Sequence, residues 1–177
     1  MANSIDREAC EFCDFEWDTV FPAEVGPRLR HAVRTFANLL IANPEESLQR
    51  PNPDRWSAVE YAAHARDVLM NLRDRIILGV VEDNPVPHGM HGTPRIELGL
   101  YDAEQPESLA NELVVVAEIF IRTYDHLPPH AGSRPIFYGW PVATTRTLDW
   151  VAAQALHECE HHLDDAKFDL DEIARLA

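Results

Sequence analysis

Residues 56–67 read Trp56-Ser-Ala-Val-Glu-Tyr-Ala-Ala-His64-Ala-Arg-Asp67, and they contain the clearest helix start in the chain. Ser57 and Glu60 form a capping box, in which each side chain accepts a hydrogen bond from the backbone amide of the other residue. Trp56, just before the cap, is placed to pack against Tyr61. Apolar residues then recur at helical spacing as far as Val81. We therefore expect a long helix with one buried face.

Three further segments show the same apolar periodicity, at about residues 22–42, 106–127 and 147–170. Proline residues follow the first two segments, and Thr147 is the expected N-cap of the last. No segment shows convincing strand alternation. The sequence therefore predicts an all-α protein whose default architecture is a four-helix bundle.

The stretch 82–104 is rich in proline and glycine and predicts a long irregular crossover between the second and third helices. Loops of this length usually have a function, so we expect it to cover a site. His88 and His91 lie in this stretch, where they are placed to line the mouth of that site.

Length and charge restrict the kind of protein. The 177 residues fit a single domain, predicted to span 1–177 with a short N-terminal arm at about 1–20. Fifteen basic residues against 30 acidic ones give a net charge of −15, which repels polyanions, so we expect neither nucleic acid nor a membrane as partner. The acidic N-terminus does not resemble a signal peptide and no apolar run is long enough to span a bilayer, so we expect a cytoplasmic protein.

Histidines on the last helix suggest a metal site. The run His157-Glu-Cys-Glu-His161-His162 places His157 and His161 one turn apart, a separation at which two imidazoles can share an ion. By the same geometry His162 is expected to point elsewhere. His64, on the second helix, is the candidate for a third ligand. The alternatives are a partly exposed histidine pair on a polar helix and a His64 that simply hydrogen-bonds to Glu60.

The segments 56–67 and 157–162 together resemble the DinB-like superfamily, which includes the DinB/YfiT-like proteins, the bacillithiol transferases and the mycothiol-dependent maleylpyruvate isomerases. The resemblance implies an up-down-down-up bundle, often as a homodimer, with a divalent metal such as zinc or nickel held by His64, His157 and His161. In the isomerases a glutamate commonly stands at the position of His157 and a further C-terminal domain binds substrate. Both features are missing here, which weakens the case for maleylpyruvate isomerisation.

Three imidazoles leave a coordination position open, as in catalytic sites. The leading hypothesis is activation of a low-molecular-weight thiol for transfer to a small-molecule electrophile. Metal-dependent hydrolysis and a non-catalytic ion that pins two helices are the alternatives. Four carboxylates are candidate helpers: Glu60 and Asp67 as groups that orient ligands, and Glu160 and Asp164 as bases. The acidic last helix reads mostly as a solvated face, and attraction of a cation is the alternative.

Cys10 and Cys13 form a Cys-x-x-Cys pair, which is half of a zinc site. Three interpretations stay open: free thiols on a mobile arm, a second metal site completed by histidine or by a dimer mate, and a redox dithiol. Cys159 lies on an apolar stripe of the last helix and is expected to be buried.

Overall fold

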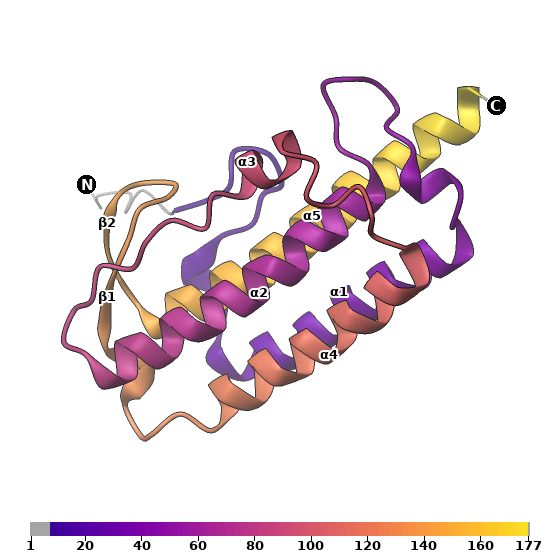
Figure 1. The fold of residues 1–177 in the computed structure, drawn as a ribbon. Helices are drawn as coiled ribbons and strands as arrows, with labels where there is room; N and C mark the ends of the chain where they lie inside the picture. The colour runs from indigo at the N-terminus through magenta and orange to yellow at the C-terminus, as the bar shows by residue number, and fades with distance from the viewer. Residues whose placement is uncertain (1–7, 177) are drawn as a thin grey trace, which may run out of the picture.

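The computed structural model describes residues 8–176 and confirms the helical bundle (Figure 1). Residues 1–7 of the predicted N-terminal arm lie outside the described part. The four long helices are α1 (Pro22–Ala42), α2 (Ala58–Val81), α4 (Pro106–Asp125) and α5 (Leu148–Leu176). The short helix α3 (Gly92–Glu97) lies in the crossover, and three 3-10 turns complete the helical segments: η1 (Trp17–Thr19), η2 (Glu46–Leu48) and η3 (Ala131–Ser133). None of the described helices combines the length and apolar character needed to span a bilayer.

The direction of the helices explains the long crossover. In Figure 1, α1 and α5 run one way along the bundle and α2 and α4 run the other way. Because α2 and α4 are consecutive long helices with the same direction, the chain between them has to travel back along the bundle. Each of α1 and α2 packs against α4 and α5, and α1 and α2 barely touch each other. The shared interior is filled by fully buried apolar side chains such as Leu29, Phe36, Leu69, Leu113 and Phe120.

Helix starts follow the sequence signals. Ser57 Oγ accepts a hydrogen bond from the Glu60 amide at 3.2 Å, and Glu60 Oε2 accepts one from the Ser57 amide at 2.8 Å. The rings of Trp56 and Tyr61 are 5.2 Å apart, as the expected packing requires. At the start of α5, the Trp150 amide donates to Thr147 Oγ1 at 3.1 Å. These contacts fix where α2 and α5, the helices that carry the histidines, begin.

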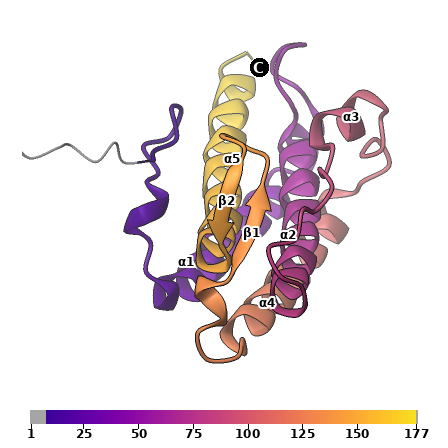
Figure 2. The ribbon, with the colours of Figure 1, turned by 90° about the vertical axis from the view of Figure 1, so that its left-hand side faces the viewer.

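One local feature differs from the prediction. Residues 135–147 form an antiparallel hairpin of β1 (Pro135–Tyr138) and β2 (Thr144–Thr147), which lies beside the start of α5 (Figure 2). Its strands are only four residues long, too short for alternation to stand out from the sequence. The Phe137 amide also donates to the Pro85 carbonyl at 2.9 Å, so the hairpin holds the beginning of the crossover.

Gly79 provides a test of how tightly α2 approaches α5. A Cβ added there would lie 2.5 Å from Leu148 Cδ2 and 3.3 Å from Leu148 Cγ, and Leu148 is fully buried. We predict that Gly79→Ala lowers the free energy of unfolding by about 1–3 kcal/mol, although alanine favours helix more than glycine does. Urea unfolding measures the change. Gly139→Ala, where nothing lies within 4 Å, is the matched control; an equal loss in both variants would contradict the packing argument.

Candidate metal centre

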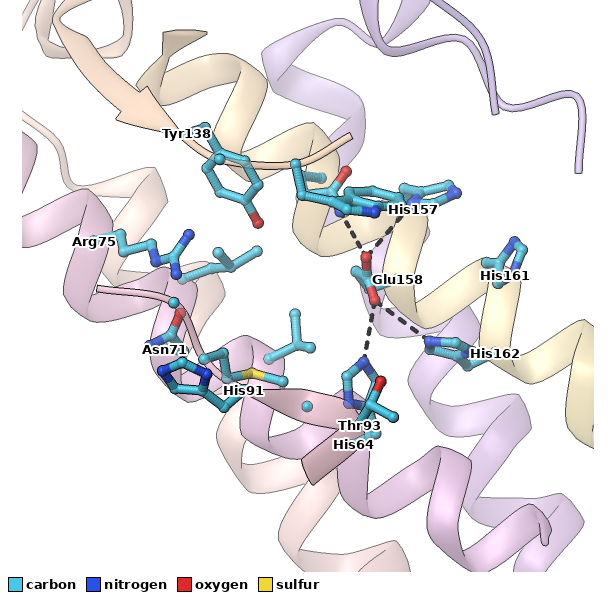
Figure 3. Close-up of a pocket in the computed structure, with 18 of the residues that line it drawn as sticks. His64, Asn71, Arg75, His91, Thr93, Tyr138, His157, Glu158, His161 and His162 are labelled. Carbon is cyan, nitrogen blue, oxygen red and sulfur yellow. Dashed lines mark hydrogen bonds and ion pairs between the residues drawn. The ribbon is translucent and has the colours of Figure 1, made fainter. Parts of the chain in front are cut away.

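A cavity of about 700 Å³ lies between α2, α5, the crossover and the β-hairpin (Figure 3). All three histidines predicted as ligands line it, and so does His91 of the crossover. His88, also expected at the mouth, does not line the cavity; its carbonyl accepts a hydrogen bond from Arg75 Nη2 at 2.8 Å. The structure therefore has a cavity beneath the crossover, where the sequence predicts a site.

The structure divides the three predicted ligands between two groups. His64 Nε2 lies 3.4 Å from Glu158 Oε2, and His162 Nε2 lies 3.4 Å from the same oxygen. The potential ligand atoms of His64, Glu158 and His162 all lie within 4.8 Å of one another. His157 and His161 instead group with two cysteines of the N-terminal segment. Within residues 8–176, His64, His157 and His161 do not form a group of this kind.

The reason is that α5 contains two overlapping pairs four residues apart. His157 and His161 form one, and Glu158 and His162 form the other, rotated by about 100° around the helix axis. The Glu158–His162 face is the one that meets His64 on α2 (Figure 3). His162 thus points away from the face of His157 and His161, as expected, but its own face and not theirs meets His64. The Glu-x-x-x-His pattern was present in the sequence, but only the packing of α5 on α2 selects it.

Other side chains orient these three groups. His162 Nδ1 lies 3.0 Å from Asp165 Oδ2, which leaves Nε2 facing Glu158. Glu158 Oε1 accepts a hydrogen bond from Gln154 Nε2 at 2.6 Å, and Gln154 Oε1 accepts one from Trp17 Nε1 at 2.6 Å. A carboxylate that holds the second nitrogen of a histidine is the usual arrangement around metal-binding imidazoles.

The electrostatics favour a positive charge at the centre of this cluster. Burial alone would raise the pKa of Glu158, but its contacts with His162 and His64 hold that pKa well below its usual range. Burial alone would lower the pKa of His162, but Asp165 and Glu158 together raise it to about 9. His162 is therefore protonated at pH 7 when no ion is bound, and a metal ion would have to displace this proton.

The donor set fits a divalent transition metal. In a tetrahedral zinc site, nitrogen and oxygen ligands at about 2.1 Å from the ion are about 3.4 Å apart. Both measured separations between imidazole nitrogen and Glu158 Oε2 are 3.4 Å. Two imidazoles and one carboxylate suit zinc or nickel and leave a position for another ligand.

The two α2 carboxylates suggested as helpers have structural partners. Glu60 closes the capping box and pairs with Arg50, and although burial opposes it, this pairing keeps the pKa of Glu60 below its usual value. Asp67 pairs with Arg95 and accepts a hydrogen bond from Tyr101 Oη at 3.0 Å, which ties the crossover to α2. Neither carboxylate lines the cavity.

The two α5 carboxylates suggested as bases also lie outside the cavity wall. Glu160 pairs with Arg28 of α1 at 2.7 Å, and the exposed Asp164 pairs with Lys167 at 2.8 Å. The carboxylates in the cluster are instead Glu158, two residues before Glu160, and Asp165, one residue after Asp164. Both lie on the face of α5 that meets α2.

The second group consists of Cys10, Cys13, His157 and His161, whose potential ligand atoms also lie within 4.8 Å of one another. Burial lowers the pKa of His157 to about 4, so its ring is neutral at pH 7. Burial raises the pKa of Cys13 to about 12. Reactive Cys-x-x-Cys pairs have a lowered thiol pKa, so this shift argues against a redox dithiol.

Substitution of Glu158 tests whether the cluster of His64, Glu158 and His162 binds a metal ion. We predict that Glu158→Gln lowers the metal content by one equivalent per chain, because a glutamine amide is a far weaker ligand for zinc than a carboxylate. Elemental analysis of the purified variant gives the result. Glu160→Gln, two residues along the same helix but paired with Arg28, is the matched control and is expected to keep the wild-type content. Equal metal content in both variants would rule out Glu158 as a ligand.

Comparison with known proteins agrees with this architecture. The sequence model of the DinB superfamily matches residues 27–166, a range that includes α2 and most of α5. YfiT from Bacillus subtilis, described as a probable metal-dependent hydrolase with an unusual four-helix bundle topology, has a similar fold. The TM-score is 0.76 at 14% sequence identity, over 88% of this chain and 87% of that chain. A search of curated proteins gave no match. The chain belongs to the DinB superfamily.

Proposed function

We propose that this protein is a metal-dependent enzyme that transfers a low-molecular-weight thiol to a small anionic electrophile. The observation that carries the proposal is the His64–Glu158–His162 cluster, which opens onto a cavity of about 700 Å³. This volume lies within the usual range for small-molecule sites. A divalent ion bound to the cluster would supply Lewis acidity that lowers the pKa of a thiol at its open position.

The composition of the cavity wall favours a thiol over water as the nucleophile. Among the described residues that line it, Glu158 is the only carboxylate, and its oxygens contact His64, His162 and Gln154. A thiol with a pKa near 8.5 ionises more readily beside a cation than water does, because the pKa of bulk water is about 15.7. Among the described wall residues, no carboxylate is free to act as a base for water.

Hydrolysis is the second candidate. Two histidines and a glutamate are also the ligands of several zinc hydrolases, and YfiT is described as a probable metal-dependent hydrolase. The thiol proposal draws support from the resemblance once the register is revised. The isomerase relatives carry a glutamate in the histidine pair of the last helix, and it is missing when that pair is taken as His157 and His161. The structure instead brings Glu158 and His162 to His64, a pair that begins with a glutamate.

Arg75 indicates the charge of the electrophile. Its side chain lines the cavity and only 8% of the residue is exposed, yet among the described residues no carboxylate pairs with it. Nη2 donates to a backbone carbonyl, the guanidinium lies 4.9 Å from the centre of the Tyr138 ring, and Nε is buried without a hydrogen-bond partner. A buried guanidinium with a free donor is suited to a carboxylate of the substrate.

The reaction requires few groups from the protein. The thiol loses its proton to solvent, a carbon–sulfur bond forms, and the leaving group departs with the electron pair of its bond to carbon. Asp165 and Gln154 hold His162 and Glu158 in place during this step. Trp56, whose ring lies 5.4 Å from that of His64, shields the cluster on the α2 side.

Thiol conjugation can be assayed with 4-chloro-3-nitrobenzoate, which releases chloride, and with cysteine, glutathione, mycothiol or bacillithiol as the thiol. We predict zinc- or nickel-dependent conjugation with at least one thiol, and its loss in Glu158→Gln but not in Glu160→Gln. Metal-dependent cleavage of aryl esters without any thiol conjugation would favour the hydrolase. Absence of both activities in the metal-loaded protein would favour a non-catalytic ion.

The role of Arg75 is tested by comparing that benzoate with its neutral methyl ester. We predict that Arg75→Met raises KM for the benzoate about 10- to 100-fold, the effect of losing a charge-assisted hydrogen bond worth about 1.5–3 kcal/mol. KM for the ester should stay close to the wild-type value. A parallel rise for both electrophiles would show that Arg75 shapes the cavity without binding an anion.

A further inference from the structure

The N-terminal segment brings Cys10 and Cys13 to the face of α5 that carries His157 and His161. The cluster of His64, Glu158 and His162 uses the other face. Cys10 Sγ lies 3.9 Å from His161 Nδ1, and the potential ligand atoms of Cys10, Cys13, His157 and His161 all lie within 4.8 Å of one another. In a tetrahedral zinc site, sulfur and nitrogen ligands are about 3.6 Å apart. Only a small closure of the four groups would therefore complete such a site.

His157 supplies an independent reason to expect a ligand here. Only 2% of the residue is exposed, and both ring nitrogens are buried without a hydrogen-bond partner. Its Nδ1 lies 3.9 Å from Glu158 Oε1, too far for a hydrogen bond, and aromatic rings surround it, with the Phe15 ring 5.0 Å and the Trp17 ring 4.8 Å away. A buried polar group left without a partner costs about 1–3 kcal/mol. A metal ion bound to one nitrogen would remove part of that cost.

His161 is oriented for the same centre. Its Nε2 lies 3.4 Å from Asp165 Oδ2, while Nδ1 faces Cys10. This is the carboxylate–histidine arrangement already described for His162, and the same Asp165 oxygen serves both rings. His161 Nδ1 is thereby left available to an ion shared with the cysteines.

The cysteines are fixed in place by a turn that is anchored to α5. The Cys10 amide donates to the Phe15 carbonyl at 2.8 Å, and Asp14 adopts a left-handed conformation with φ of 52° that reverses the chain. Trp17 is buried, stacks on Trp150 at 5.8 Å and hydrogen-bonds to Gln154. Residues 8–17 therefore form a clasp that packs on α5, in which Cys10 is buried and Cys13 is partly buried.

We propose that Cys10, Cys13, His157 and His161 bind a second zinc ion, distinct from the ion at the first cluster. Two thiolates and two imidazoles are a complete tetrahedral set, which is typical of closed structural sites, and this soft donor set selects zinc. The ion would fasten the N-terminal clasp to α5. Cys10 and Phe12 line the cavity, so this second site also shapes the wall of the first.

Cobalt substitution of the full-length protein tests the site. Thiolate ligands give Co²⁺ a charge-transfer absorption in the near ultraviolet, which nitrogen and oxygen ligands do not produce. We expect this band in the wild type, its loss in Cys13→Ser, and one zinc equivalent fewer in the zinc-loaded form of that variant. Cys159→Ala, which removes a buried α5 thiol outside the group, should keep the band.

The experiment tests the two proposed metal sites separately. Glu158→Gln should lose the first ion and keep the thiolate band, so failure of the proposed enzyme would leave this inference standing. A wild-type cobalt spectrum without the band would overturn it, whether or not Cys13→Ser folds. If the intact mass of the wild type is two hydrogens lower than that of the reduced chain and Cys13→Ser leaves the zinc content unchanged, Cys10 and Cys13 form a disulfide instead.

Discussion

Glu158 is a carboxylate with only 15% of its side chain exposed, and a charge in that setting has to be compensated. The compensation comes from His64 on α2 and from His162 one turn further along α5. Gln154 satisfies the other oxygen and connects it to Trp17 near the N-terminus. The pairing of this single carboxylate therefore links α2, α5, the N-terminal segment and the wall of the cavity.

Adjacent residues of α5 belong to different side-chain clusters because successive side chains of a helix diverge by about 100°. Glu158 and His162 face α2, whereas His157 and His161 face the N-terminal clasp formed by residues 8–17. Asp165 contacts both His161 and His162, so it couples the two faces. The division separates two sorts of chemistry: an open set of nitrogen and oxygen donors at the cavity, and a closed set that includes both cysteines.

Much of the fold could be predicted from local signals. Capping at Ser57 and Thr147 and the apolar periodicity placed the four long helices close to their observed bounds. The choice between His157 and Glu158 as partner of His64 could not be made in this way, because both belong to pairs four residues apart. It depends on the rotation of α5 against α2. The polar residues Gln154, Glu158, His162 and Asp165 follow a helical stripe that resembles a solvated face until α2 and Arg55 cover it.

The central claim is that the face of α5 with Glu158 and His162, and not the face with His157 and His161, holds an ion together with His64. A crystal structure of the zinc-loaded protein, with anomalous data collected at the zinc edge, tests it most directly. The account predicts an anomalous peak within bonding distance of His64 Nε2, Glu158 Oε2 and His162 Nε2. A peak bound by His64 together with His157 or His161 would contradict it.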